Sequence, residues 1–338
     1  MAAVAQKTVT ADEAGMRLDR WFKTHYPGIA FGQLQKLMRS GQVRVDGGRV
    51  KTSTRLAAGQ TVRIPPVGDE VSAKPVTPNT MRDRHDADVI AENTLFEDDK
   101  VLVINKPSGL AVQGGSGLNR HVDGMLESYR DRKGQKPRLV HRLDRDTSGV
   151  LVIAKTRLAA SFLTKAFRDR TTKKVYWAMV RGVPRPPQGR LATWLMKGED
   201  EHGDQKMEVL RDKAKGADHA VTLYSTLEWV GQKVSWVSLR PVTGRMHQLR
   251  VHMDHLGHPI IGDKKYFSVD NWELPGGIQN KLHLHARRII IPHPDGGEID
   301  VSAPLPPHMV QSWNLFGFDT STYDAIQAET VDSGEDIE

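Results

Sequence analysis

The chain has 338 residues, of which 38% are hydrophobic and 26% charged, and its formal net charge is +7. It contains no cysteine, which excludes disulfides, thiolate zinc sites and cysteine nucleophiles. No apolar run approaches the roughly 18 residues of a membrane span, and residues 1–10 lack the apolar stretch of a secretory signal. We therefore expect a globular, cytoplasmic protein with no membrane partner.

The basic charge is concentrated near the N-terminus. Residues 16–65 contain ten Lys and Arg against two Asp. Apolar spacing predicts a helix over residues 16–23 and another over 34–39, and a hairpin follows around Asp46-Gly47-Gly48. Short helices and strands with a basic face predict a small RNA-binding module, and a basic capping domain without RNA contact is the alternative.

The rest of the chain divides by composition. Residues 66–94 mix Pro, Asp, Lys and Asn with few apolar residues, and predict a linker at 69–94 after a first domain at 14–68. A main domain follows at 95–315. The tail at 316–338 is acidic and is expected to be disordered. Removing the seven acids of residues 319–338 from the +7 total leaves +14 on the remainder, which points to a nucleic acid partner.

Short apolar runs predict the strands of the main domain. Buried strands are expected at 101–106, 149–154 and 174–180, and turns separate them. A helix is expected at 157–169, with one apolar face formed by Leu158, Phe162, Ala166 and Phe167. Many short strands with few helices between them predict an α+β fold around a large mixed, mostly antiparallel sheet.

The segment His141–Gly149 carries the strongest chemical signal. It places Asp144 between Arg142 and Arg145, directly before a buried strand. Neighbouring guanidinium groups keep a carboxylate ionised, which suits a nucleophile or an electrostatic anchor. A surface loop of ion pairs is the alternative.

No other pattern indicates a cofactor or a metal. The glycine-rich segment 105–115 matches neither a P-loop nor a dinucleotide fingerprint. Histidines gather at 247–258 and 283–293, but no Asp or Glu completes a known ligand spacing. A glycoside hydrolase would need a second, separate carboxyl group, and only Asp146 lies near Asp144 in the sequence.

His141–Gly149 resembles the HRLDxxTSG signature of the RluA/RluC/RluD-type RNA pseudouridine synthases. Asn105–Gly115 resembles their NKPxGxxVH segment, Lys174–Val180 resembles KxYxAxV, and Leu239–His252 resembles LxPxTGRTHQIRxH. Residues 16–65 resemble the S4 RNA-binding domain. The departures are Gln113 for a frequent His, Met246 for Thr, and Phe31-Gly32 at the start of the second helix.

The resemblance implies a role for each matching residue. Asp144 would be the catalytic residue, Arg245 its ion-pair partner, and Tyr176 and Leu249 would pack on the target base. Arg142 would enter the RNA at the place that the base leaves; the alternative is that Arg142 forms an ion pair with a neighbouring acid. The alternative for Tyr176 is a tyrosine of the hydrophobic core. In the S4-like domain the RNA-binding candidates are Arg17, Arg20, Lys36, Arg39, Arg44, Arg49 and Lys51.

The resemblance also implies the reaction. Isomerising uridine to pseudouridine needs no redox change, and therefore no cofactor. Large-subunit (23S) ribosomal RNA is the favoured substrate, and no obligate protein partner is evident, so a monomer is expected. Two alternatives stay open: a synthase acting on transfer RNA, and a non-catalytic RNA-binding factor for ribosome assembly.

Overall fold

The computed structural model describes residues 4–26, 28–66, 81–115, 120–131, 134–199, 205–267, 276–321 and 323. The chain forms two compact units, a small one built mainly from the N-terminal 80 residues and a large one built from most of the rest. Within the described ranges, no helix is long and apolar enough to cross a membrane.

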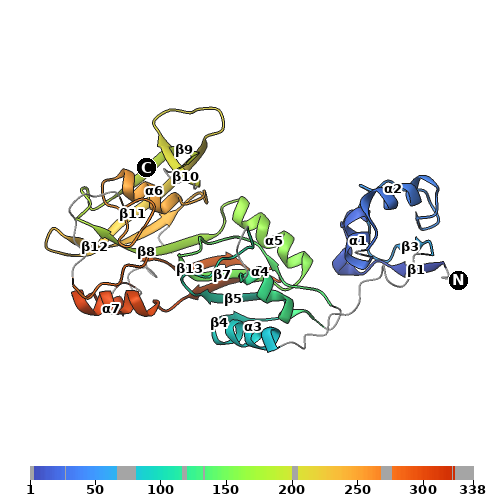
Figure 1. Cartoon of the computed structure of the whole chain (residues 1–338), viewed down its shortest axis with the longest axis horizontal. Helices are drawn as coiled ribbons and strands as arrows, with labels where there is room; N and C mark the ends of the chain where they lie inside the picture. Colours follow the sequence, from blue (N-terminus) through green and yellow to red (C-terminus); the bar gives the residue numbers. More distant parts are fainter. Residues whose placement is uncertain are drawn as a thin grey trace. The chain divides into compact units, whose positions relative to one another are not determined.

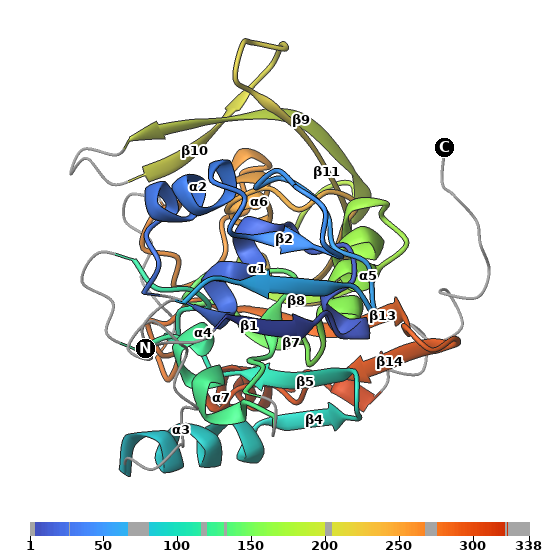
Figure 2. The ribbon, with the colours of Figure 1, turned by 90° about the vertical axis from the view of Figure 1, so that its right-hand side faces the viewer.

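The small unit packs two helices on a three-stranded sheet (blue in Figure 2). Its elements are β1 (Ala5–Thr8), α1 (Leu18–His25), α2 (Phe31–Arg39), β2 (Arg44–Val45) and β3 (Thr61–Ile64), with strand order β1-β3-β2. Both predicted helices are present, and they bury Leu18, Trp21 and Leu34 in one core. The unit begins before the predicted residue 14, because β1 pairs with β3.

The predicted turn at Asp46-Gly47 forms, with φ of 48° and 77° at these two residues. The hairpin around it is only partly right, because β2 pairs along its length with β3 rather than with a strand at Val50.

The predicted linker at 69–94 is wrong in its second half. Residues Met81–Glu92 form helix α3, which belongs to the large unit. Ile90 of this helix is buried beside Leu102 and Val122. Residues 67–80 lie outside the described part of the chain.

One large mixed sheet organises the large unit, as the sequence predicted (Figure 1). Its strand order is β10-β9-β11-β12-β8-β13-β7-β5-β4, with β14 on β13 and β6 on β7. Among the described strands, β13 and β7 pair in parallel and the other neighbours are antiparallel. The strands are β4 (Thr94–Glu97), β5 (Val101–Lys106), β6 (Arg138–Leu139), β7 (Ser148–Ala154), β8 (Lys173–Arg181), β9 (Gln188–Glu199), β10 (Gln205–Leu210), β11 (Asp218–Val230), β12 (Val234–Pro241), β13 (Leu284–Pro292) and β14 (Glu298–Ser302).

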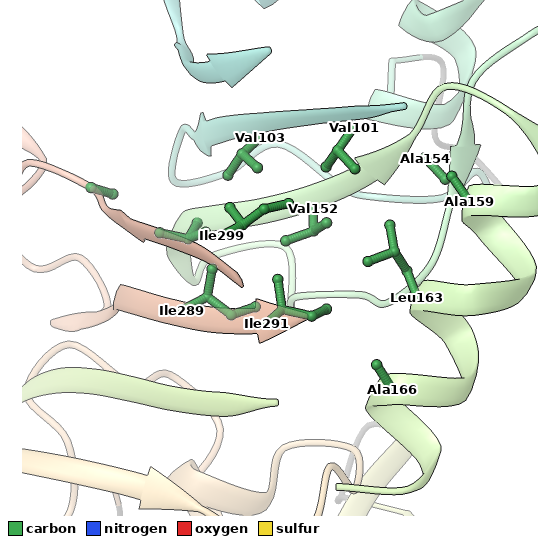
Figure 3. Close-up of a cluster of buried hydrophobic side chains, with 12 residues drawn as sticks. Val101, Val103, Val152, Ala154, Ala159, Leu163, Ala166, Ile289, Ile291 and Ile299 are labelled. Carbon is green, nitrogen blue, oxygen red and sulfur yellow. The ribbon is translucent and has the colours of Figure 1, made fainter. Parts of the chain in front are cut away.

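Helices cover both faces of this sheet. On one face, α5 (Arg157–Arg168) packs on β5, β7 and β13 (Figure 3), and α7 (Pro307–Phe316) packs on β8 and β12. On the other face, α3 and α4 (Val122–Met125) cover β5 and β7, and α6 (Gln248–His255) covers β8 and β12. Tyr176 of β8 contacts both clusters of this second face. Tyr176 therefore connects the cluster under α3 and α4 with the cluster under α6.

Helix α5 buries only part of the predicted apolar face, because Ala166 and Phe167 pack against the core but Leu158 and Phe162 do not. Ala159, Leu163 and Ala166 are buried against the sheet, whereas Leu158 and Phe162 are 54% and 40% exposed. Both sets have helical spacing. The structure selects the set with two alanines, whose small side chains let the helix lie close to the strands.

The start of the predicted acidic tail packs against the large unit. Phe318 is buried in the cluster around Trp236, and the Tyr323 hydroxyl donates a hydrogen bond to the Leu227 carbonyl (3.0 Å). Residues 322 and 324–338 lie outside the described part of the chain, so the predicted disorder there stays a prediction.

Candidate active site

Asp144 lies in the loop between β6 and β7, and a second loop holds this one in place. The Gly109 N–H donates to the Arg145 carbonyl (3.0 Å), and the Ser108 hydroxyl donates to the Asp146 carbonyl (2.8 Å). Within the loop, the Thr147 N–H donates to the Asp144 carbonyl (3.2 Å). The backbone around Asp144 is thus fixed on both sides.

Gly149 ends the loop where β7 meets β13. Its φ is +110°, and a Cβ there would lie 2.2 Å from the Ala286 carbonyl oxygen. Next to it, the Ser148 hydroxyl lies 2.9 Å from Nδ1 of the buried His285. The Ser-Gly pair of the signature is therefore needed for the close strand pairing rather than for chemistry.

Lys106 forms hydrogen bonds to both loops. This role was not predicted from the sequence. Lys106 is fully buried, and its Nζ donates to the carbonyls of Pro107 (2.9 Å), Leu110 (2.7 Å) and Arg145 (3.0 Å). Burial lowers the pKa of Lys106 to about 7, although the charges of Asp146 and Asp144 oppose the shift. A lysine at the end of a buried apolar strand was the available signal.

Two side chains of the α6 region face the Asp144 carboxylate, whose side chain is 20% exposed. Arg250 Nη1 lies 3.7 Å from Oδ2, and His247 Nε2 lies 4.0 Å from Oδ1. Arg250 also forms two hydrogen bonds of 2.7 Å to Asp263, a fully buried carboxylate. Asp263 thereby fixes the plane of the guanidinium that approaches Asp144.

The prediction that Arg245 pairs with Asp144 is wrong. Its guanidinium lies 3.4 Å from Asp218 and donates from Nε to the His219 carbonyl (3.2 Å). Arg245 precedes α6, whereas Arg250 lies inside it, and the chain changes direction between them at His247, whose φ is +51°. Arg250 therefore takes the position beside Asp144.

Gln248 builds the turn that precedes α6. Its Oε1 accepts from the Thr243 hydroxyl (2.7 Å) and the Arg245 N–H (3.0 Å), and its Nε2 donates to Val221 O and Thr222 Oγ1 (2.9 Å each). Both lone pairs and both N–H groups of this buried amide are therefore used. Gln248 is thus a structural member of the motif.

Tyr176 and Leu249 lie in the same hydrophobic cluster under α6. Burial raises the pKa of the Tyr176 phenol, and the Asp144 charge adds to the shift. Tyr176 is therefore a neutral phenol that senses the Asp144 charge. Leu249 is 7% exposed in the free protein.

The remaining members of the signature have distinct environments. Arg142 is exposed to solvent. His141 accepts a hydrogen bond at Nε2 from the Val152 N–H (2.8 Å) and stacks on Phe167 at 4.4 Å. Burial lowers the pKa of His141 to about 3, so this imidazole is neutral and structural.

The basic candidates of the small unit are mostly solvent-exposed. Arg17 forms an ion pair with Asp19 (2.6 Å), and Arg44 donates to the carbonyls of Gly41 and Gly47. The exposed members are Arg17, Arg20, Lys36, Arg39, Arg49 and Lys51, and Arg44 is half-buried.

Histidine side chains of the two histidine-rich segments form hydrogen bonds with other groups of the protein. His252 bridges the hydroxyls of Thr222 and Thr193 (2.9 Å each), and His283 bridges Lys281 O and Ser312 Oγ. Among the residues that the structure describes, no group of three His, Asp or Glu side chains is arranged to hold a metal ion.

Comparison with known proteins gives one consistent answer. Residues 100–255 match the family described as RNA pseudouridylate synthase. The chain is 37% identical over 310 residues to ribosomal large subunit pseudouridine synthase C of Pasteurella multocida, covering 91% of this chain and 92% of that protein. It is 38% identical over 306 residues to the protein of the same name from Escherichia coli, covering 88% and 92%.

Two solved structures are also similar to this chain. Human RNA pseudouridylate synthase domain containing 4 is 30% identical with a TM-score of 0.58, covering 69% of this chain and 95% of that one. Human RNA pseudouridylate synthase domain containing 1 is 28% identical with a TM-score of 0.50, covering 63% and 83%.

Proposed function

This chain belongs to the RNA pseudouridylate synthase family, and on that premise we propose that it isomerises uridines in large-subunit (23S) ribosomal RNA with Asp144 as the catalytic residue. The observation that carries the proposal is the convergence of Arg250 and His247 on the Asp144 carboxylate. Tyr176 and Leu249 lie together on the same face of the sheet.

The reaction breaks the N1–C1′ bond of uridine, turns the uracil and forms a C5–C1′ bond. C5 loses its hydrogen as a proton, and N1 gains one, so the atoms balance without a redox partner. A carboxylate supports this sequence in three ways: by adding to C1′, by adding to C6 of the base, or by removing the 2′ proton to give a glycal. Asp144 is suited to each, because its loop is fixed and its charge is only partly compensated.

Arg250 compensates the Asp144 charge only partly, because Asp263 binds the same guanidinium. Arg250 carries one positive charge and lies between two carboxylates, at 2.7 Å from Asp263 and 3.7 Å from Asp144. The three groups together carry a net charge of −1. Asp144 is thus oriented without being neutralised, and it favours the positive charge that develops at C1′ as the glycosidic bond breaks.

Tyr176 acts in this proposal as a neutral contact for the base. Its raised pKa keeps the phenol protonated near neutral pH. Its ring and the Leu249 side chain provide the apolar surface on which an extruded uracil packs. The exposed Arg142 is proposed to occupy the place that the base leaves.

The experiment is tritium release from large-subunit ribosomal RNA labelled with 5-³H-uridine. We expect release by the wild type and at least a 10³-fold lower rate with Asp144→Asn, which keeps the shape and removes the charge. RNA binding should be retained within a few-fold. Normal release by Asp144→Asn would refute the assignment of Asp144. Release from labelled transfer RNA alone would change the substrate, and binding without release from either RNA would indicate an assembly factor.

We also propose that the small unit is an S4-like RNA-binding domain and that the protein works as a cytoplasmic monomer. Two short helices on a small sheet, with exposed basic side chains on α1 and α2, support the first part. Such a unit adds affinity through phosphate contacts without reading bases.

The double variant Lys36→Gln/Arg39→Gln tests this role of the small unit. We expect weaker RNA binding and a salt slope that is less steep by about 0.7 for each lost phosphate contact. Lys155→Gln is the control, since Lys155 pairs with Glu97 in the large unit. An unchanged slope in the double variant would remove α2 from the RNA interface.

A further inference from the structure

A chain of hydrogen bonds leads from strand β10 toward the Asp144 carboxylate. The Met207 N–H donates to the Tyr266 hydroxyl oxygen (2.8 Å), and that hydroxyl lies 2.9 Å from His247 Nδ1. The other ring nitrogen of His247, Nε2, faces Asp144 Oδ1 at 4.0 Å. Tyr266 and Met207 are buried, so water does not replace these contacts.

The positions of two protons follow from this geometry. The Tyr266 oxygen already accepts from Met207, and its own proton has one partner among the described residues, His247 Nδ1. If Nδ1 carried a proton, the buried Tyr266 O–H would be left without an acceptor, at a cost of about 1–3 kcal/mol. Tyr266 therefore donates to Nδ1, and the neutral imidazole carries its proton on Nε2.

We propose that His247 is a positioning residue for Asp144: the Tyr266 hydroxyl fixes the Nε2–H tautomer, and this N–H aligns Oδ1 during the reaction. The inference rests on Asp144 being the catalytic residue. At 4.0 Å the N–H and the carboxylate are not yet hydrogen-bonded, and the bond shortens when RNA closes the site, as is common for catalytic hydrogen bonds in free enzymes.

The backbone at His247 supports a functional role. His247 has φ of 51° and ψ of 17°, the left-handed conformation that few non-glycine residues adopt, directly before α6. Such a conformation persists where the surroundings impose it, and strain of this kind is concentrated at functional sites. Here it is the conformation that directs the imidazole between Tyr266 and Asp144.

The surroundings keep the imidazole neutral. Burial lowers the pKa of His247, with Arg250 and Lys265 acting in the same direction and the charges of Asp144 and Asp263 opposing it. Tyr266 also lies under Arg250, whose guanidinium is 5.1 Å from the ring centre. One tyrosine thus supports both neighbours of Asp144, and His247 orients the carboxylate without adding a second positive charge.

Two substitutions at His247 separate the functions of its nitrogens. In His247→Gln the side-chain N–H₂ reaches the position of Nε2, whereas in His247→Asn the shorter amide reaches only that of Nδ1. We expect the Asn variant to lose about tenfold or more in kcat with KM little changed, and the Gln variant to keep several-fold more activity than Asn. Equal losses in the two variants would overturn the proposal.

A double-variant cycle tests whether Tyr266 acts through His247. Tyr266→Phe should lower kcat about three- to tenfold in the wild-type background and less than about twofold in the His247→Gln background. Tyr323→Phe, which also loses one hydroxyl hydrogen bond, is the matched control and should keep wild-type kcat. Additive losses would show that Tyr266 acts independently of His247.

Imidazole ¹⁵N NMR of the full-length, RNA-free protein gives a readout independent of activity, with His247→Gln assigning the signals. We expect an unprotonated Nδ1 and a protonated Nε2 in the wild type, and a mixture of tautomers in Tyr266→Phe. The opposite tautomer in the wild type would refute the inference. An active Asp144→Asn variant would instead refute the proposed catalytic role and leave the tautomer result intact.

Discussion

At the residue scale, the site depends on which arginine lies beside Asp144. Arg250 forms a planar, two-bond contact with Asp263, which a lysine cannot reproduce. Arg250→Lys should therefore lower kcat by about 10²-fold, while Arg245→Lys should stay within a few-fold, because its partner Asp218 is 60% exposed. Steady-state kinetics of tritium release checks both variants. A larger loss at Arg245 would restore the original prediction.

The same two arginines show how far the sequence could predict the site. Asp144, Tyr176 and Leu249 were identified from motifs, because each stands next to a recognisable strand or helix. The resemblance assigned the ion-pair role to Arg245, and Arg250 of the same motif was not considered. The difference depends on the left-handed conformation at His247, and that conformation is imposed by contacts with residues distant in the sequence, such as Tyr266.

At the element scale, the junction of β7 with β13 depends on the absence of a side chain at Gly149. Gly149→Ala should lower the free energy of unfolding by about 2–4 kcal/mol, because a Cβ would lie 2.2 Å from a backbone oxygen at a positive φ. Gly231→Ala is the control: its φ is +56°, but nothing lies within 4 Å of the added Cβ, so about 1 kcal/mol is expected. Urea denaturation followed by circular dichroism compares them, and equal losses would contradict the crowding argument.

Helices α3 and α5 show where element prediction fails. The α3 sequence is highly charged and follows a proline-rich stretch, so composition favoured a linker. The helix is instead held by Ile90 in a core formed with distant residues. In α5 two faces have apolar spacing, and the choice between them depends on the fit to the sheet. Periodicity predicted the existence of α5 but only part of its buried face.

At the scale of the whole molecule, buried histidines make stability depend on pH. Burial lowers the pKa values of His252 and His283 to about 4 each. Between pH 6.5 and about 4 these side chains bind protons when unfolded but not when folded. The free energy of unfolding should therefore fall as the pH falls, by up to about 1.4 kcal/mol per pH unit for each histidine.

Urea denaturation across pH 4–7 measures this dependence. His283→Gln should lower the number of protons taken up on unfolding by up to one, which makes the free energy of unfolding depend less steeply on pH, whatever its effect on stability at pH 7. The same steepness in the wild type and in His283→Gln would show that His283 is not protonated on unfolding.

The overall architecture was the most predictable level. The small basic N-terminal unit, the large mixed sheet and the main strands follow from charge distribution and short apolar runs. Strand order did not follow, because neighbours such as β8 and β13 lie more than 100 residues apart in the chain.

The pairing between β7 and β13 is short, and this affects how the two sides of the site are held together. Asp144 is attached to β7, whereas Arg250 and His247 are carried by α6 over β12, and only β13 and β8 stand between. The parallel β7–β13 contact comprises two residue pairs, and β13 is irregular against β8 after Ala286. The two residue pairs between β7 and β13 are thus the direct backbone link between the strand that follows Asp144 and the strands under α6. The 3.7 Å distance between Arg250 Nη1 and Asp144 Oδ2 therefore depends on how closely β7 and β13 pair, and so on the missing side chain at Gly149.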